Sequence, residues 1–208
     1  MTHVHGHEVG FVDGSPIPVD EVDAREARLR GGPLASALPI ADTSEGRQLR
    51  RWLTQLIVTE RVIAVEAAAR GVDIDGAPTE DDLLPDITAR LEIGSIAAAA
   101  LGDVRARALF VAVTSGIDVS DDDVAAYHGR NPLRFAECRR ENYGWRAPPV
   151  IAPPLAEARQ RIAEHLRAAA RRRAFRVWLD RRRAELVELS PGYEHPGDPR
   201  QPDNTHRH

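Results

Sequence analysis

The chain has 208 residues, 42% of them apolar, which is long enough for one ordinary domain or two small ones with a sizeable core. Its formal net charge is −4 and all 28 basic residues are arginine, so we expect no general attraction to nucleic acid or to an anionic membrane. A single cysteine, Cys138, excludes an intramolecular disulfide.

The first third of the chain predicts a short hairpin and two helices. Residues 3–18 contain two short strand-like stretches around the turn signal Asp13-Gly14. Helix signals follow over 19–30 and over 44–70, where Gly71 ends the second helix. Apolar residues of this second helix recur at steps of three and four, which predicts one buried face: Leu49, Trp52, Leu53, Leu56, Ile57, Ile63 and Ala67.

The middle of the chain predicts shorter helices. Thr79 to Asp82 resembles a capping box and begins a helix that contains Pro85 in its first turns. We expect this helix to continue through Ile87 and Leu91. A further helix over 95–112 should be broken or kinked around Gly102-Asp103.

The last third predicts a short helix, a long helix and a tail. Ser120 to Asp123 caps a helix that ends before Asn131-Pro132. Pro154 opens the longest helix, which we expect to run to about Leu189. The tail from Ser190 lacks periodicity, although it could lie over the body as an ordered strap.

These elements predict a mainly α fold with a short N-terminal β-strand/turn segment and an extended histidine-rich C-terminal tail. We assign a single helical domain to 1–189 and the tail, rich in proline and histidine, to 190–208. The domain comprises the strand/turn segment 1–18, a first helical half 19–115 and a second helical half 118–189.

The start of the chain lacks the basic residues and apolar stretch of a signal peptide. The longest apolar candidate, 93–101, is far shorter than the ~18 residues that span a bilayer. We therefore expect a cytoplasmic protein without a membrane partner.

Two stretches resemble a known family. The run Val12-Asp13-Gly14-Ser15-Pro16-Ile17-Pro18 is followed by a helix and then by a leucine-rich helix that ends Ala67-Ala68-Ala69-Arg70-Gly71. Val119 to His128, with Asn131-Pro132-Leu133-Arg134-Phe135, continues the pattern. Over 12–72 and 118–188 the chain resembles the chaperone portions of SurA/PpiC-type peptidyl-prolyl isomerases.

The resemblance implies a SurA-like helical module without the parvulin domain. In that family about a hundred residues of isomerase domain would follow Phe135, whereas here the closing helix begins soon after. No catalytic residue can be carried over, so the resemblance implies no isomerase activity. It implies a helical scaffold that presents apolar grooves to a peptide or a partner helix.

The eight histidines are concentrated near the two ends of the chain. Neutral imidazole is a common ligand of zinc, copper, nickel and iron, and histidines two residues apart on an extended segment project to one side. If the two ends pair, several imidazoles could converge on one metal ion. The candidate ligands are His3, His5, His7, His195, His206 and His208. The alternatives are solvated tails and a role without metal.

Four other features have simpler interpretations. We expect His128 to be a surface or capping residue and His165 to be a half-buried helix residue. Cys138 reads as an ordinary thiol, although the arginines that follow it could lower its pKa. The arginines at 167, 171, 172, 173 and 176 read as a solvated helix face.

Three functions remain in competition. The first is a chaperone-like or assembly protein that binds a peptide or partner protein in an apolar groove. The second is a metal-binding protein or metalloenzyme acting on a small molecule, with the histidine-rich termini as its transition-metal site. The third is an arginine-mediated binder of acidic partners. Whether the chain is an enzyme or a homo-oligomer stays open, and we do not expect nucleic acid as its main partner.

Overall fold

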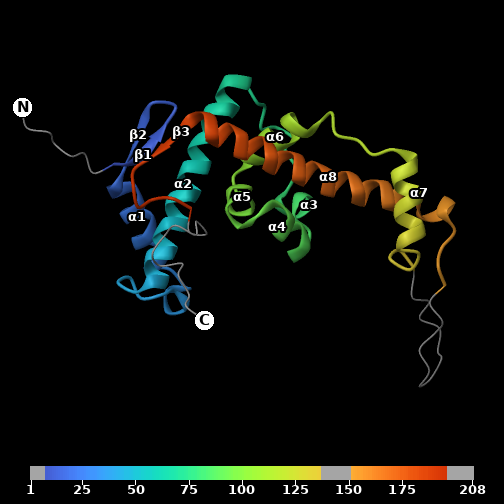
Figure 1. The fold of residues 1–208 in the computed structure, drawn as a ribbon, viewed down its shortest axis with the longest axis horizontal. Coiled ribbons are helices and arrows are strands. Elements are labelled where there is room, and N and C mark those ends of the chain that lie inside the picture. Colours follow the sequence, from blue (N-terminus) through green and yellow to red (C-terminus); the bar gives the residue numbers. More distant parts are fainter. Residues whose placement is uncertain (1–7, 137–150, 196–208) are drawn as a thin grey trace, which may run out of the picture.

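The computed structural model describes residues 8–136 and 151–195. Within these residues the chain is mainly helical, and a small antiparallel sheet lies at one end of the molecule (Figure 1). This arrangement confirms the predicted fold class. Of the predicted tail, only residues 190–195 are described.

The sheet joins the beginning of the chain to its end. Strands β1 (Glu8–Val12) and β2 (Ser15–Pro18) form the predicted hairpin. Asp13 and Gly14, with φ of 49° and 72°, adopt the left-handed conformations that a tight two-residue turn requires. Strand β3 (Val187–Leu189) pairs antiparallel with the other edge of β1, which gives the strand order β2-β1-β3.

Strand β3 corrects the prediction for the last long helix. Helix α8 (Leu155–Leu186) ends three residues before Leu189, and Val187 turns to extended backbone. The backbone N–H of Asp13 donates to the carbonyl of Leu186 over 2.9 Å. After Leu186 the backbone therefore pairs with β1 of the hairpin, and these sheet hydrogen bonds replace the ones that would have continued the helix.

Helices α1 (Val19–Arg30) and α2 (Ser44–Arg70) have the predicted bounds. The hydroxyl of Thr43 caps α2 by accepting from the N–H of Gly46 over 3.1 Å, and Gly71 ends it with a φ of 58°. The middle of α2, residues 53–59, is buried on every side. The helix is therefore central to the fold, whereas its sequence pattern predicted only one buried face.

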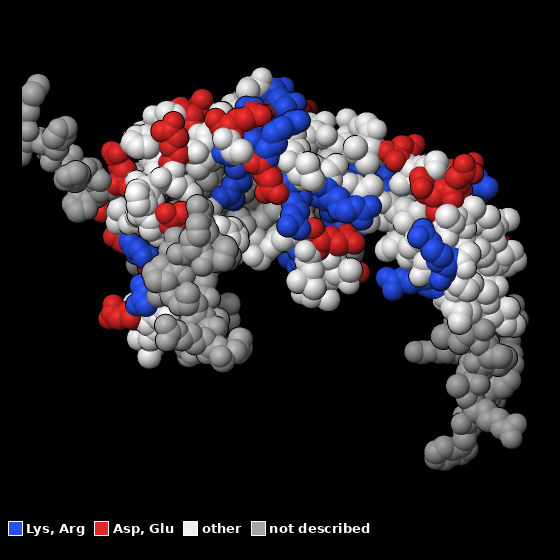
Figure 2. Space-filling model, in the orientation of Figure 1, with Lys and Arg blue, Asp and Glu red and all other residues white. Residues whose placement is uncertain are grey.

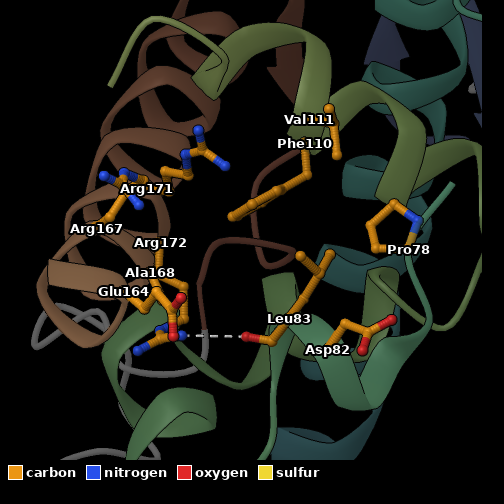
Figure 3. A pocket seen from close by; sticks show the side chains of 10 residues that line it. All are labelled: Pro78, Asp82, Leu83, Phe110, Val111, Glu164, Arg167, Ala168, Arg171 and Arg172. Carbon is orange, nitrogen blue, oxygen red and sulfur yellow. Dashed lines mark hydrogen bonds between the residues drawn. The ribbon is translucent and has the colours of Figure 1, made fainter. Parts of the chain in front are cut away.

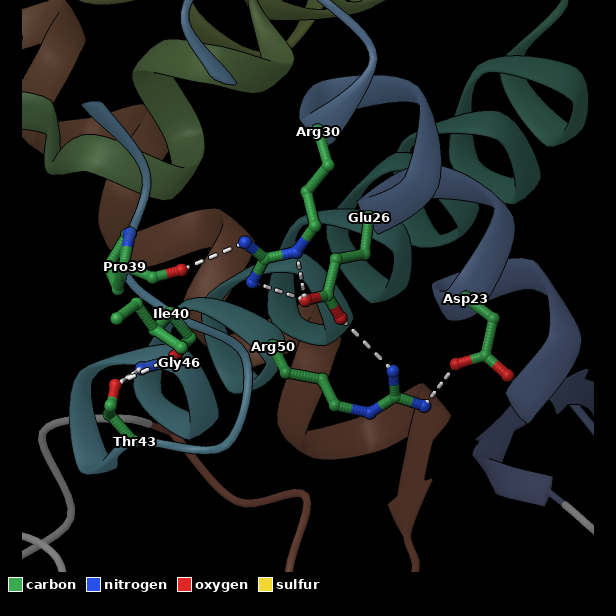
Figure 4. Close-up of polar contacts among 8 residues, drawn as sticks. All are labelled: Asp23, Glu26, Arg30, Pro39, Ile40, Thr43, Gly46 and Arg50. Atoms are coloured by element: carbon green, nitrogen blue, oxygen red, sulfur yellow. Dashed lines mark hydrogen bonds and ion pairs between the residues drawn. The ribbon is translucent and has the colours of Figure 1, made fainter. Parts of the chain in front are cut away.

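The loop between α1 and α2 is fixed by a polar network (Figure 4). Arg30 donates to Glu26 through Nε over 2.8 Å and to the carbonyl of Pro39 over 2.8 Å. Arg50 of α2 reaches Glu26 and Asp23 of α1 at 3.2 and 2.5 Å. These contacts hold the loop, with its short 3₁₀ turn η1 (Ala35–Ala37), against the start of α2.

The helix predicted to run from residue 80 through Leu91 is two helices. Helix α3 (Glu80–Leu83) ends before Pro85, which lacks the N–H that a longer helix needs. Asp86 then caps α4 (Ile87–Ile93) by accepting from the N–H of Ala89 over 2.8 Å. The expectation of one continuous helix from residue 80 through Leu91 is therefore wrong. Ile87 and Leu91 both lie in α4, where they are 68% and 72% exposed.

The remaining helices follow the predicted order. Helices α5 (Ser95–Ala100) and α6 (Val104–Thr114) are separated at the predicted break, where Asp103 caps α6. Helix α7 (Asp121–Arg130) begins at the predicted cap, where Ser120 and Asp123 form a capping box by bonding each other's backbone N–H. None of the described helices combines the length and the apolar character that crossing a membrane requires.

The buried apolar residues form two clusters along α8. The larger one joins the sheet, α2, α5, α6 and the second half of α8, and it contains Leu53, Leu109 and Phe175. The smaller one joins α7 to the first half of α8 through Val124 and Ile162. Helix α8 therefore connects a main body to a smaller lobe at the far end (Figure 1).

Candidate functional site

A pocket of about 300 Å³ lies in the main body between α8, α6 and the chain around α3. Its apolar wall comes from all three segments, and Figure 3 shows these side chains around the central space. This wall comprises Pro78, Leu83, Phe110, Val111 and Ala168. We call this space, with its arginines, the α3/α6/α8 pocket.

Local structure explains how the apolar wall is positioned. Phe110 is buried, and its ring packs against the ring of Phe175 with centroids 5.1 Å apart, which fixes α6 against α8. Leu83 is the last residue of α3, because Pro85 prevents the helix from continuing. Val111 is 41% exposed and lies at the edge of the pocket.

Three arginines of α8 line the pocket beside this wall: Arg167, Arg171 and Arg172. The basic side chains gather over the middle of α8, with acidic side chains interspersed (Figure 2). The side chain of Arg172 is only 6% exposed. The prediction that this whole cluster is a solvated helix face is therefore wrong for Arg172.

Two of the three guanidinium groups are paired. Arg172 donates to Glu92 of α4 over 2.8 Å and to the carbonyl of Leu83 over 3.2 Å, which is the dashed line in Figure 3. Arg167 donates to Asp118 over 2.9 Å. A hydrogen bond from the N–H of Val119, and then the Arg167 guanidinium, lower the pKa of the Asp118 carboxyl.

Arg171 differs from its two neighbours. Within the described part of the chain its guanidinium makes no ion pair, and its Nε–H is shielded from solvent without an acceptor. A shielded N–H without an acceptor costs about 1–3 kcal/mol. In Figure 3 the side chain extends from α8 along the wall of the pocket.

The two acidic residues that line the pocket have other partners. Asp82 accepts from the hydroxyl and the N–H of Thr79 over 2.7 and 2.8 Å, and these bonds lower its pKa. Glu164 accepts from Gln160 over 3.0 Å. The charge of Arg171 is therefore not neutralised by an acidic group bonded to it from the pocket lining.

A second pocket, of about 440 Å³, lies between the turn from α4 to α5, the second half of α8 and the start of the tail. Its charged residues are Arg176, Asp180 and Arg183, and His195 lines it as well. Arg183 donates to Thr59 over 2.8 Å and to Gln55, both neutral, and its burial lowers the pKa of this guanidinium.

His195 is the one proposed metal ligand that lies within the described residues, where it is exposed at this second pocket. The other five, His3, His5, His7, His206 and His208, lie outside the described residues, so their convergence stays a prediction. Across 8–136 and 151–195, no three histidine, cysteine, aspartate or glutamate side chains group in a way that could hold a metal ion.

The tail begins as an ordered strap, as the sequence allowed. Gln55 of α2 donates to the carbonyl of Tyr193 over 2.7 Å, and the N–H of Ser190 donates to the carbonyl of Val9 over 3.0 Å. Residues 190–195 therefore lie across α2 beside the sheet. The contact depends on Gln55, a buried polar residue of α2. The pattern of apolar residues in the sequence of α2 did not reveal this role.

The two remaining histidines lie in the smaller lobe. His165 is partly buried, as predicted, with its Nε2 3.2 Å from the hydroxyl of Tyr127 and its ring beside Phe135. Burial, followed by the charge of Arg134, lowers its pKa. Nε2 of His128 lies 2.9 Å from the carbonyl of Pro153 and ties α7 to the start of α8. Cys138 lies outside the described residues.

Comparison with known proteins adds little to this geometry. The model of a family of unknown function, DUF7158, matches residues 8–45. This match covers the hairpin, α1, the loop held by Arg30 and the first two residues of α2, and it ends before the residues of the α3/α6/α8 pocket. No curated protein and no solved structure matches the chain.

Proposed function

We propose that this chain is a chaperone-like or assembly protein without prolyl isomerase activity, and that it binds an apolar segment of a peptide or partner protein in the α3/α6/α8 pocket. The observation that carries the proposal is the apolar wall of this pocket, formed by Leu83, Phe110, Val111 and Ala168 around about 300 Å³. Pockets of this kind and size typically hold apolar groups.

The size of the pocket also suggests how tightly it binds. Burying one leucine or phenylalanine side chain contributes about 1.5–3 kcal/mol. One such contact supports only weak affinity, and neighbouring contacts are needed to reach a Kd of about 1 μM. Weak and reversible binding suits a protein that shields unfolded segments and then releases them.

The resemblance to SurA/PpiC-type chaperone portions supports the same function. In SurA/PpiC-type proteins a closing helix follows the isomerase domain and completes the helical module. Here α8 contributes Phe175 and Leu179 to the main core, and β3 joins the N-terminal hairpin. The long closing helix is thus part of the body that holds the pocket.

An aggregation assay with a pocket-filling variant tests this function. Ala168→Leu adds a side chain to the pocket wall and keeps a good helix former in α8. Ala184→Leu makes the same change at an exposed position of the same helix. We expect the parent and Ala184→Leu to suppress aggregation of an unfolded client, and Ala168→Leu to lose most of this activity. Equal suppression by both variants would rule out the pocket.

A second candidate function is transition-metal binding by the terminal histidines. The pairing of β1 with β3 favours it, because the hydroxyl of Ser190 donates to the carbonyl of Glu8 over 2.9 Å. This bond holds Ser190, which precedes His195 in the tail, beside Glu8, the first residue that the structure describes.

Metal analysis of protein purified without an affinity tag tests the second candidate. We expect close to one equivalent of zinc, copper, nickel or iron that survives mild chelation. The double variant His206→Ala and His208→Ala should lose it. Metal that leaves with mild chelator, or that the double variant retains, contradicts this function.

A further inference from the structure

The guanidinium of Arg171 is the unexplained charge of the α3/α6/α8 pocket. Its neighbours in the lining are bonded to acids, Arg172 to Glu92 and Arg167 to Asp118. Arg171 is half-buried, and within the described residues it has no bonded acid. A partly desolvated cation without a counter-ion costs free energy that an anionic ligand could recover.

The residues around Arg171 do not supply that anion. Asp82 is held in its capping box with Thr79 by bonds of 2.7 and 2.8 Å. Glu164 is bonded to Gln160 on the same face of α8. Asp118 is engaged by Arg167 and acts on Arg171 only through a longer-range attraction.

We infer that Arg171 binds the C-terminal carboxylate of a peptide whose last side chain is apolar and occupies the α3/α6/α8 pocket. This inference rests on the proposed function, which supplies the apolar half of the interaction. Arginine suits this role because its planar guanidinium donates two parallel hydrogen bonds to a carboxylate.

A chain end fits this pocket better than an internal acidic residue. In the last residue of a peptide, the carboxylate and the side chain are attached to the same Cα. They can therefore reach Arg171 and the apolar wall together within about 300 Å³. A chain that continued past the pocket would bring further backbone N–H and C=O groups against the apolar wall, where they would need partners. The nearby carbonyl of Leu83 already accepts from Arg172.

Binding of matched labelled peptides to the full chain, followed by fluorescence anisotropy, tests the inference. One short peptide of serine and glycine ends in leucine with a free carboxylate, and the second is identical but amidated. A third carries an internal aspartate beside leucine and an amidated end. We expect the free acid to bind about 10-fold or more tightly than either amidated peptide.

Two arginine variants assign this difference to Arg171. Arg171→Gln should bind the free acid about 10-fold more weakly and should no longer distinguish it from the amide. Arg173→Gln, the same charge change at an exposed residue outside the pocket lining, should retain the full preference. Thermal melting of each variant confirms that the fold is intact.

The outcomes separate the inference from the proposed function. If the amidated peptide binds as tightly as the free acid while Ala168→Leu weakens both, the carboxylate inference fails and the apolar pocket stands. Tighter binding of the internal aspartate peptide also overturns it. If Ala168→Leu changes no affinity, the proposed function fails, and this inference fails with it.

Discussion

Arg172 of α8 donates its Nε–H to Oε2 of Glu92 in α4 over 2.8 Å, and only 6% of the Arg172 side chain is exposed. A second bond joins Arg172 to the carbonyl of Leu83 at the end of α3. One side chain therefore connects three helices at the base of the α3/α6/α8 pocket. These bonds add to the apolar packing that holds α3 and α4 against the body.

Arg172→Ala should destabilise the protein by about 2–3 kcal/mol. It leaves Glu92 without its partner and removes the packing of the buried arginine stem. Because Glu92 remains partly exposed, the loss should be smaller than for a fully buried pair. The measurement is urea unfolding followed by circular dichroism. Arg173→Ala, at an exposed site on the same helix, should change stability by no more than about 0.5 kcal/mol.

Gly46→Ala should destabilise the protein by about 2 kcal/mol or more. A Cβ at Gly46 would lie 2.1 Å from the carbonyl oxygen of Ile40 and 2.4 Å from that of Ala41, so the loop after α1 would have to move. Gly129→Ala in α7 is the opposite case, because a Cβ there meets nothing within 4 Å. It should leave stability unchanged or raise it by up to about 1 kcal/mol. Similar effects of both substitutions on the melting temperature would contradict this description of the loop.

His165 should make the protein less stable in mild acid. Burial lowers its pKa in the folded chain below the ordinary value of 6.5. Near pH 8 the imidazole is neutral in both states and the stability is complete. As the pH falls through 6.5, the unfolded chain takes up the proton first, and stability is lost until the folded pKa has also been passed.

Melting curves between pH 8 and pH 5 check this sign. Between pH 8 and pH 5 the melting temperature of the wild-type protein should fall further than that of His165→Gln, because glutamine does not titrate. Carboxyls such as Asp118, whose pKa is lowered from an ordinary value of 3.8, take up protons only in more acidic solution, so they do not contribute over this interval. An equal loss in the two proteins would show that His165 does not contribute.

Truncation after Leu186 should destabilise the main body by about 3 kcal/mol or more. It removes β3 and the contact between Gln55 and Tyr193, and it exposes the apolar surface that Leu189 and Tyr193 cover. Amide exchange in β1 should accelerate, because β1 loses its neighbour on one edge. Truncation after His195 keeps these contacts, and its exchange rates in β1 should match those of the full chain.

The sequence predicted the elements whose signals are local. Asp13-Gly14, Gly71 and the cap at Ser120 act within a few residues, and the hairpin and helix ends occur where these signals place them. Strand β3 depends instead on pairing with residues far away in the sequence. Leu189, for example, pairs with Gly10, about 180 positions earlier. A continuous helical pattern in the sequence could not reveal that partner.

The pocket was harder to predict for the same reason. Arg167 and Arg171 stand four residues apart with Ala168 between them, a spacing that places all three on neighbouring parts of one helix face. That signal was present, but the apolar wall comes from Leu83 and Phe110, on other helices. Only the packing of α3 and α6 against α8 brings these residues to the arginines.

Site-specific photo-crosslinking tests the central claim most directly. A benzophenone amino acid in place of Val111, at the edge of the pocket, is compared with the same residue in place of Val177, which is 69% exposed on α8 and outside the pocket lining. We expect a labelled peptide that ends in leucine to crosslink at position 111 and not at position 177. Crosslinking that is equal at the two positions, or that occurs only at position 177, contradicts binding in the α3/α6/α8 pocket.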